Sequence, residues 1–344
     1  MNINHPLIHK NHTFTLDRKI LFIDSNDRDI NKWQNSSEFE INCPENYNNV
    51  ESLRLLNIQL PSFFFNISER LQTNKFIIEI ASTKHTITLT DGYYDHNNIR
   101  NALEKLIKSE TGDNDFIVKY NDINKKFYFG HPTSSFKLIF NEQINYNNCP
   151  NDTFKDTYKI NIYDQHSKWG LGFMLGFEKK TYISSSVNDN AGITTKDVDF
   201  DHELSGPWIT NSVTAQIIKS LTPSDLENHQ FIYIEMEKYN KCDELKPFLY
   251  YKYNNSNSGI VNSAFAKIPI VPSPYNQCLI NDGYLENISY YQPPIDKIAK
   301  LKVKFRYHNG MLVDFQNFNV SFAIEINQIR NEMNDYNVRT PFKL

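Results

Sequence analysis

The chain has 344 residues and a formal net charge of −4 at pH 7, with 36 basic and 40 acidic side chains interspersed along it. It lacks the basic stripe with which proteins bind a phosphate backbone, so direct binding of nucleic acid is not expected. With 24 Phe, 20 Tyr and an apolar fraction of 40%, the composition excludes a disordered chain and favours β structure, because aromatic side chains suit half-buried pleated surfaces.

The N-terminal residues lack the apolar run of a signal peptide, and no later stretch has the roughly 18 consecutive apolar residues that cross a bilayer. We therefore expect no transmembrane segment and synthesis in the cytoplasm. The four cysteines lie far apart and form no C-x-x-C pair, so free thiols are expected in place of a zinc or redox site.

The first part of the chain predicts strands separated by an Asp-rich turn. Residues 14–23 are apolar and β-favouring and end in the polar run 24–29, whose short side chains can bond their own backbone. Further strands are expected at 38–41 and within 50–60, where apolar and polar residues come to alternate. Pro61 ends the last of them, because proline has no N–H to donate.

The next part predicts a strand pair, a helix and a meander. Residues 76–80 and 85–90 indicate two paired strands joined by residues 81–84. Apolar residues at helical spacing from Ile99 to Ile107 predict one amphipathic helix, which Asp95 can cap and beyond which Gly112 lies. The meander is expected from three short runs, at 116–120, 127–130 and 136–140.

The run 169–177 (WGLGFMLGF) contains three glycines among aromatic and aliphatic residues. Glycines at this spacing suit a close approach of backbone to neighbouring groups. A phosphate-binding loop is not indicated, because the pattern is not G-x-G-x-x-G and no Lys-Ser or Lys-Thr follows. A packed turn with buried aromatic residues is the preferred interpretation.

The last part begins with a Ser-, Asp- and Gly-rich loop at 183–208 and then predicts strands again. Lys302, Lys304 and Arg306 lie on one face of a predicted strand at 301–307, and Lys300, just before the strand, extends that face. This basic face is interpreted as solvated, with contact to an acidic neighbour as the alternative. The other predicted strands lie at 231–237, 264–271 and 311–326, and a His308-Asn309-Gly310 turn precedes the last of these.

These elements together predict a mainly β fold. Residues 1–74 and 182–344 are expected to form an antiparallel, jelly-roll-like β-sandwich, and residues 75–181 an inserted ββα plus meander subdomain.

The segment from Ile20 to Asn66 carries a dense series of short motifs. In chain order they are Ile23-Asp24-Ser25, Arg28-Asp29, Ser37-Glu38-Phe39, Asn49-Val50, Ser52-Leu53-Arg54-Leu55, Pro61 and Phe65-Asn66-Ile67. Weaker pieces follow in matching order at 91–94, 171–177, 265–268 and 310–326. In this order the motifs resemble the minor capsid or vertex (penton-like) structural proteins of large nucleocytoplasmic double-stranded DNA viruses.

The resemblance implies a non-enzymatic subunit of an icosahedral capsid, with a jelly-roll core, found in the virion and made in the host cytoplasm. Its implied partners are the major capsid protein and other minor capsid proteins, in a homo-oligomer or a larger assembly. It implies no catalytic, cofactor-binding or metal-binding residue. Trp33-Gln34-Asn35 departs from the family pattern and residues 209–253 match nothing in it, so partner-specific surface is expected there.

One acidic cluster could bind a metal ion. Carboxylates alternate along D-V-D-F-D-H-E, at Asp197, Asp199, Asp201 and Glu203, and carboxylate oxygens are ligands for Ca²⁺. The turn glycine of a calcium loop is missing, so a solvated acidic segment is preferred. Whether this cluster binds a metal stays open.

Two other clusters are interpreted as structural. In the run 24–29, Arg28 stands where a ligand would be needed, which indicates a turn. Zinc binding by the N-terminal histidines would need a helix, which Pro6 opposes; these histidines are His5, His9 and His12.

Two functions other than a capsid role are kept open. A carbohydrate-binding or host-attachment protein would use exposed aromatic residues, and the ones to examine are Trp33, Trp169 and Trp208. A hydrolase on a β scaffold would use the carboxylates between Asp197 and Glu203 as acid and base. No G-x-S-x-G, H-E-x-x-H or P-loop motif supports the enzymatic alternative.

Overall fold

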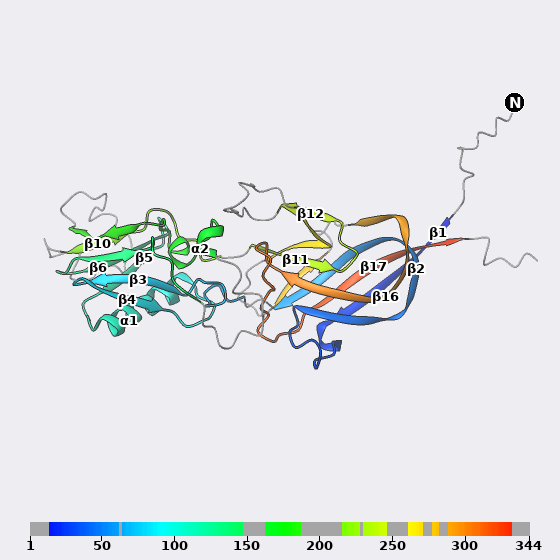
Figure 1. Cartoon of the computed structure of the whole chain (residues 1–344), viewed down its shortest axis with the longest axis horizontal. Helices are drawn as coiled ribbons and strands as arrows, with labels where there is room; N and C mark the ends of the chain where they lie inside the picture. Colours follow the sequence, from blue (N-terminus) through cyan, green and yellow to red (C-terminus); the bar gives the residue numbers. More distant parts are fainter. Residues whose placement is uncertain are drawn as a thin grey trace, which may run out of the picture. The chain divides into compact units, whose positions relative to one another are not determined.

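The computed structural model describes residues 14–61, 64–146, 162–186, 215–227, 230–245, 261–270, 277–281 and 288–331. The chain divides into two compact units (Figure 1). Unit 1 contains residues 1–62, 231–246 and 259–344, and unit 2 contains residues 63–230 and 247–258. The strand pairings between the described strands are antiparallel, which confirms the predicted mainly β, antiparallel fold class. The described helices include none with the length and apolar character of a membrane span.

Unit 1 is built on a seven-stranded sheet in the order β1-β17-β2-β16-β11-β14, with β15 also paired to β2. Its strands are β1 (Phe14–Asp24), β2 (Glu38–Pro61), β11 (Phe231–Met236), β14 (Ala266–Pro269), β15 (Gln277–Asn281), β16 (Ser289–Arg306) and β17 (Ser321–Asn331). A two-stranded sheet of β12 (Cys242–Leu245) and β13 (Val261–Ala264) completes the unit.

The 24-residue strand β2 organises this sheet and curves along its length (Figure 1). One edge of β2 pairs first with β16 and then with β15, while the other edge pairs with β17. The sequence predicted two strands here instead of one. They join because residues 43–46 bulge out between the pairs Asn42–Lys300 and Tyr47–Ile298. Pro44 lies in this bulge, where its missing N–H costs no ladder hydrogen bond.

The core of unit 1 comes from alternate residues of its long strands. Side chains that β1, β2, β16 and β17 bury include Leu21, Ile23, Phe39, Leu53, Leu55, Ile58, Val303, Phe305, Phe322 and Ile324. The predicted strand at 311–326 was too long, because β17 begins only at Ser321. Before it, the Asp314 carboxylate accepts from the N–H of Gln316, and Gln316 and Asn317 adopt positive φ, which turns the chain.

Unit 2 contains two four-stranded sheets, in the orders β4-β3-β7-β8 and β5-β6-β10-β9. The strands are β3 (Lys75–Ile80), β4 (Thr83–Thr88), β5 (Ile117–Asn121), β6 (Lys126–His131), β7 (Phe136–Ile139), β8 (Thr181–Ile183), β9 (Ser185–Ser186) and β10 (Gln216–Lys219). The predicted meander was wrong at its third strand, because β7 pairs with β3 and not with β6. The predicted pairing of the first two strands, β3 with β4, is confirmed.

Helix α1 (His96–Thr111) confirms the predicted helix and its caps. The Asp95 side chain accepts from the N–H of Asn98, and Gly112 ends the helix in the left-handed conformation. Short helices α2 (Ile162–Gln165) and α3 (Leu171–Met174) follow later in the unit. The buried face of α1 joins a core with many aromatic residues, which include Phe76, Phe116, Phe127, Phe129, Phe136, Phe140 and Phe177.

The division of the chain at 75 and 181 stays a prediction. Unit 2 as delimited by its contacts is longer than the predicted insertion, because β10 pairs with β6 and so belongs to this unit. Of the four cysteines, Cys43 and Cys242 are free thiols, as predicted.

Candidate assembly surfaces

The motif residues from Asp24 to Ser36 fold a loop and fasten it to the segment before β17. Asp24 accepts from the N–H of Asn26 and so caps the 3-10 turn η1 (Ser25–Asp27). Ser25 is fully buried; its hydroxyl donates to the Asn319 side chain over 3.1 Å and accepts from the N–H of Val320 over 2.8 Å. A loop near the start of the chain is thereby held by one near its end.

The Arg28 guanidinium braces the same loop. Its nitrogens donate to the carbonyl oxygens of Ser25 at 2.7 Å, Trp33 at 3.1 Å and Gln34 at 3.2 Å, and to the Asn319 side chain at 3.0 Å. The guanidinium donors thus satisfy backbone carbonyls of the loop, which have no strand partner. The loop consequently presents a fixed surface, on which Ile30 is exposed.

Replacing Arg28 with Ala is expected to destabilise this loop by about 1.5–3 kcal/mol, the usual value of hydrogen bonds to a charged group. Hydrogen exchange at the amide of Ser25, which donates to Val320, would report the loss. Asn31→Ala is the control, because that side chain is exposed. Equal exchange in the two variants would contradict the brace.

Strand β1 exposes apolar side chains on one face while burying others on the opposite face. Leu16, Ile20 and Phe22 are 56%, 45% and 76% exposed, whereas Leu21 and Ile23 are buried. We call the three exposed residues the β1 stripe. Among the described residues β1 pairs with β17 alone, so its other edge is open there. Sequence reasoning missed this stripe, because residues 20–23 are apolar without interruption and do not show which face is covered.

The predicted basic face of β16 meets acidic residues of its own chain. Lys300 lies 3.3 Å from Glu40 and Lys304 lies 3.2 Å from Glu38, both on β2. Lys302 lies 3.5 Å from Glu237, which follows β11. These carboxylates belong to the chain itself, so the face is close to neutral; contact with an acidic neighbouring protein stays a prediction.

Arg306 ends this row as a buried charge. Its side chain is 5% exposed and forms ion pairs with Glu235 of β11 and Glu244 of β12. The guanidinium also lies over the Tyr233 ring, 4.8 Å from its centroid. Burial, followed by the hydrogen bond to Glu244, raises the pKa of Tyr233, so this phenol stays protonated. The cluster fastens the short sheet of β12 and β13 to the main sheet.

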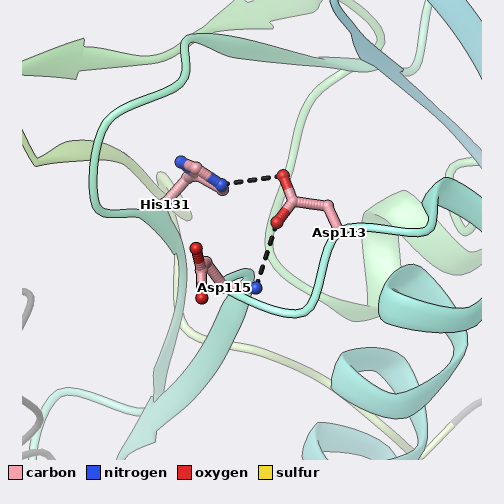
Figure 2. A group of neighbouring side chains, drawn as sticks. All are labelled: Asp113, Asp115 and His131. Atoms are coloured by element: carbon pink, nitrogen blue, oxygen red, sulfur yellow. Dashed lines mark hydrogen bonds and ion pairs between the residues drawn. The ribbon is translucent and has the colours of Figure 1, made fainter.

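The described residues bring one potential metal-binding group together, in unit 2 (Figure 2). Asp113 and Asp115 follow α1, and His131 ends β6; their nearest ligand atoms lie within 4.8 Å of one another. The His131 ring is buried, and its Nε2 lies 2.7 Å from a carboxylate oxygen of Asp113 without the alignment of a hydrogen bond.

The other ring nitrogen argues against a metal ion. Nδ1 of His131 accepts from the backbone N–H of Thr133 at 3.1 Å and of Ser134 at 2.7 Å. These bonds assign the proton of the neutral ring to Nε2. A metal-bound histidine needs the reverse, a free lone pair toward the metal and an N–H on the second nitrogen. The chemistry of this donor set therefore fits a structural histidine.

We expect His131→Leu to cost about 1–3 kcal/mol, because two backbone N–H groups lose their acceptor. His131→Asn should cost less, since its side-chain oxygen can accept in place of Nδ1. Zn²⁺ added to the unsubstituted chain should leave its melting temperature unchanged. Thermal unfolding of the two variants and of the unsubstituted chain, with and without Zn²⁺, checks these expectations. A melting temperature that rises with Zn²⁺ in the unsubstituted chain but not in His131→Asn would show a metal site.

The other candidate residues fall into two groups. The N-terminal histidines, the carboxylates from Asp197 to Glu203 and Trp208 lie outside the described residues. Trp33 has Lys32 and Lys302 near its ring, at 5.4 and 5.5 Å from the centroid. Trp169 packs edge-on against Phe140 and Tyr163. Both described tryptophans are partly buried.

A small cavity in unit 2 is bordered by Tyr146, Tyr163 and Trp169. Its volume is about 30 Å³, close to that of one water molecule and well below that of a usual ligand pocket. It gives no support to the carbohydrate-binding alternative.

Comparisons with known proteins find structural similarity to two solved structures. No protein-family model matches the sequence, and no curated protein matches it. The mavirus penton protein is similar over 92% of this chain and 100% of its own, with 10% identity and a TM-score of 0.38. A chain from the Sputnik virophage structure is similar over 93% of this chain and 99% of its own, with 8% identity and a TM-score of 0.39. With TM-scores this low, the two likenesses carry no inference about function.

Proposed function

We propose that this chain is a structural, non-enzymatic protein of the icosahedral capsid of a large DNA virus, a minor capsid or vertex subunit. The observation that carries the proposal is the motif series between Ile20 and Asn66 and its place in the fold. Its residues form the last part of the edge strand β1, the braced loop held by Ser25 and Arg28, and the strand β2 that pairs with three others.

A subunit of this kind works by geometry. The buried Arg306 cluster joins the short sheet of β12 and β13 to the main sheet of unit 1 and so holds the two together. On that rigid support, the β1 stripe and the braced loop are presented to neighbours. Contacts that are individually weak become stable when symmetry repeats them. The expected partners are the major capsid protein, other minor capsid proteins and further copies of this chain, within the virion.

Quantitative mass spectrometry of purified, detergent-stripped virus particles tests the proposal. We expect this chain in a fixed ratio to the major capsid protein, retained after washing at high salt. Virions of the source virus that lack the chain, or that lose it together with contaminating host proteins, would overturn the capsid assignment. Cryo-electron microscopy of the same particles would then separate a vertex position from one elsewhere in the shell.

A further inference from the structure

The open edge of β1 is a surface without a described partner in the chain. The β1 stripe alternates along this 11-residue strand with period two, and only the polar residue Arg18 interrupts it. Arg18 is held by an ion pair with Glu325 of β17. An exposed, regular edge strand with an apolar face favours the addition of another strand.

The C-terminal segment of the chain has the sequence pattern of such a strand. Residues 336–344 read Y-N-V-R-T-P-F-K-L, so Tyr336, Val338, Phe342 and Leu344 fall on one face and polar residues or proline on the other. This segment lies outside the described residues. Its apolar face is interrupted once, at Thr340, in the middle.

The two patterns match in spacing and in their interruption. If Arg18 lies opposite Thr340, each residue of the β1 stripe lies opposite an apolar residue of the segment, whether the strands run parallel or antiparallel. The stripe from Leu16 to Phe22 spans about 20 Å and the segment about 27 Å, so the segment covers it.

The position where the segment leaves the sheet favours a second copy over its own chain. β17 ends at Asn331, which is the register partner of Phe14 at the start of β1, and Arg330 is ion-paired with Asp17 at this corner. To pair with the open edge of its own β1, the segment would have to cross from β17 past β1, two strand spacings of about 5 Å each, within the four residues 332–335. A segment from a neighbouring copy needs no such crossing.

We propose that residues 336–344 of one copy add as a strand to the open edge of β1 in another copy, with the apolar side chains of the two strands in contact. This inference deepens the proposed function, since it names the partner and the residues of one contact between subunits. The inference rests on the proposed function only in assigning this contact to a virion. Strand addition itself can be measured on the purified chain.

Site-specific photo-crosslinking of the full chain tests it. A benzophenone amino acid replaces Phe342 in an equal mixture of ¹⁴N- and ¹⁵N-labelled protein at the highest soluble concentration, and mass spectrometry identifies the crosslinked peptides. We expect crosslinks to residues 16–22, including pairs that join one isotope to the other. The same probe at Lys343, which the pattern places on the opposite face, should give few of them.

Phe22→Asp should reduce the yield of these crosslinks about tenfold or more, because a buried aromatic contact is replaced by a charge. Phe318→Asp is the matched control, since Phe318 is also exposed, at 54%, but lies outside β1. Crosslinks confined to single-isotope pairs would show that the segment pairs within its own chain and would overturn the inference. So would crosslinks elsewhere, no crosslinks, or a yield that Phe22→Asp leaves unchanged. Absence from virions would instead overturn the proposed function alone.

Discussion

Arg306→Met is expected to destabilise unit 1 by about 3–5 kcal/mol, the cost of leaving buried charges without their partner. The side chain of Glu244 is 7% exposed and has Arg306 as its principal counter-charge, so its carboxylate would remain in a dry site. Glu235 would lose the same partner. Hydrogen exchange of the β16 amides in increasing urea would measure the loss in unit 1 separately from unit 2.

Lys300→Met on the same strand is the matched control. Lys300 is exposed and pairs with Glu40, so its loss should change stability by less than about 1 kcal/mol. The double variant Arg306→Met with Glu244→Met should recover part of the cost, because removing both charges leaves neither desolvated. If Arg306→Met costs no more than Lys300→Met, the buried cluster does not stabilise the sheet.

Local signals were enough to predict several elements. Helix α1 was predictable because its apolar spacing, the Asp95 cap and the Gly112 stop all lie close together in the sequence. The pairing of β3 with β4 followed from two adjacent runs of β-favouring residues. By contrast, the pairing of β7 with β3 depends on which surfaces pack in the core, and neighbouring sequence does not carry that information.

The candidate surfaces depended mostly on contacts between distant residues. Arg28 bonds Asn319, 291 positions later in the chain, and the sequence shows the motif without showing this partner. The basic residues of β16 were evident from alternation, but their acidic partners, on β2 and β11 and just after β11, became known only from strand order. The exposure of the β1 stripe likewise depends on β1 being an edge strand.

In the glycine-rich run 169–177, the residue type itself predicted a close approach of neighbouring groups to the backbone. A Cβ on Gly172 would lie 2.3 Å from the Trp169 ring and 2.5 Å from the Phe140 ring, so only glycine fits this aromatic cluster. Gly176 adopts a φ of 87°, and its carbonyl accepts from the N–H groups of both Leu221 and Thr222. The predicted close approach and packed turn are confirmed at these two positions.

Gly176→Ala is therefore expected to destabilise unit 2 by about 3 kcal/mol or more, the sum of a left-handed backbone on a non-glycine residue and an overpacked contact. The added Cβ would lie 2.2 Å from the carbonyl oxygen of Thr222, a backbone atom that cannot rotate away. The segment around Thr222 would have to move, which breaks its hydrogen bonds to Gly176. Hydrogen exchange of the β6 and β10 amides would measure the effect.

Gly112→Ala separates the two causes. Gly112 also has a positive φ, 72°, but a Cβ there would meet nothing within 4 Å, so only the backbone cost of about 1 kcal/mol should appear. The difference between the two alanine variants then isolates the contact with Thr222. Equal losses of stability in the two variants would mean that the backbone around Thr222 moves without cost, and that residues 170–176 are not packed rigidly against it. A larger loss at Gly176 would show that one methyl group is enough to separate the two segments, which explains why glycine stands at this position.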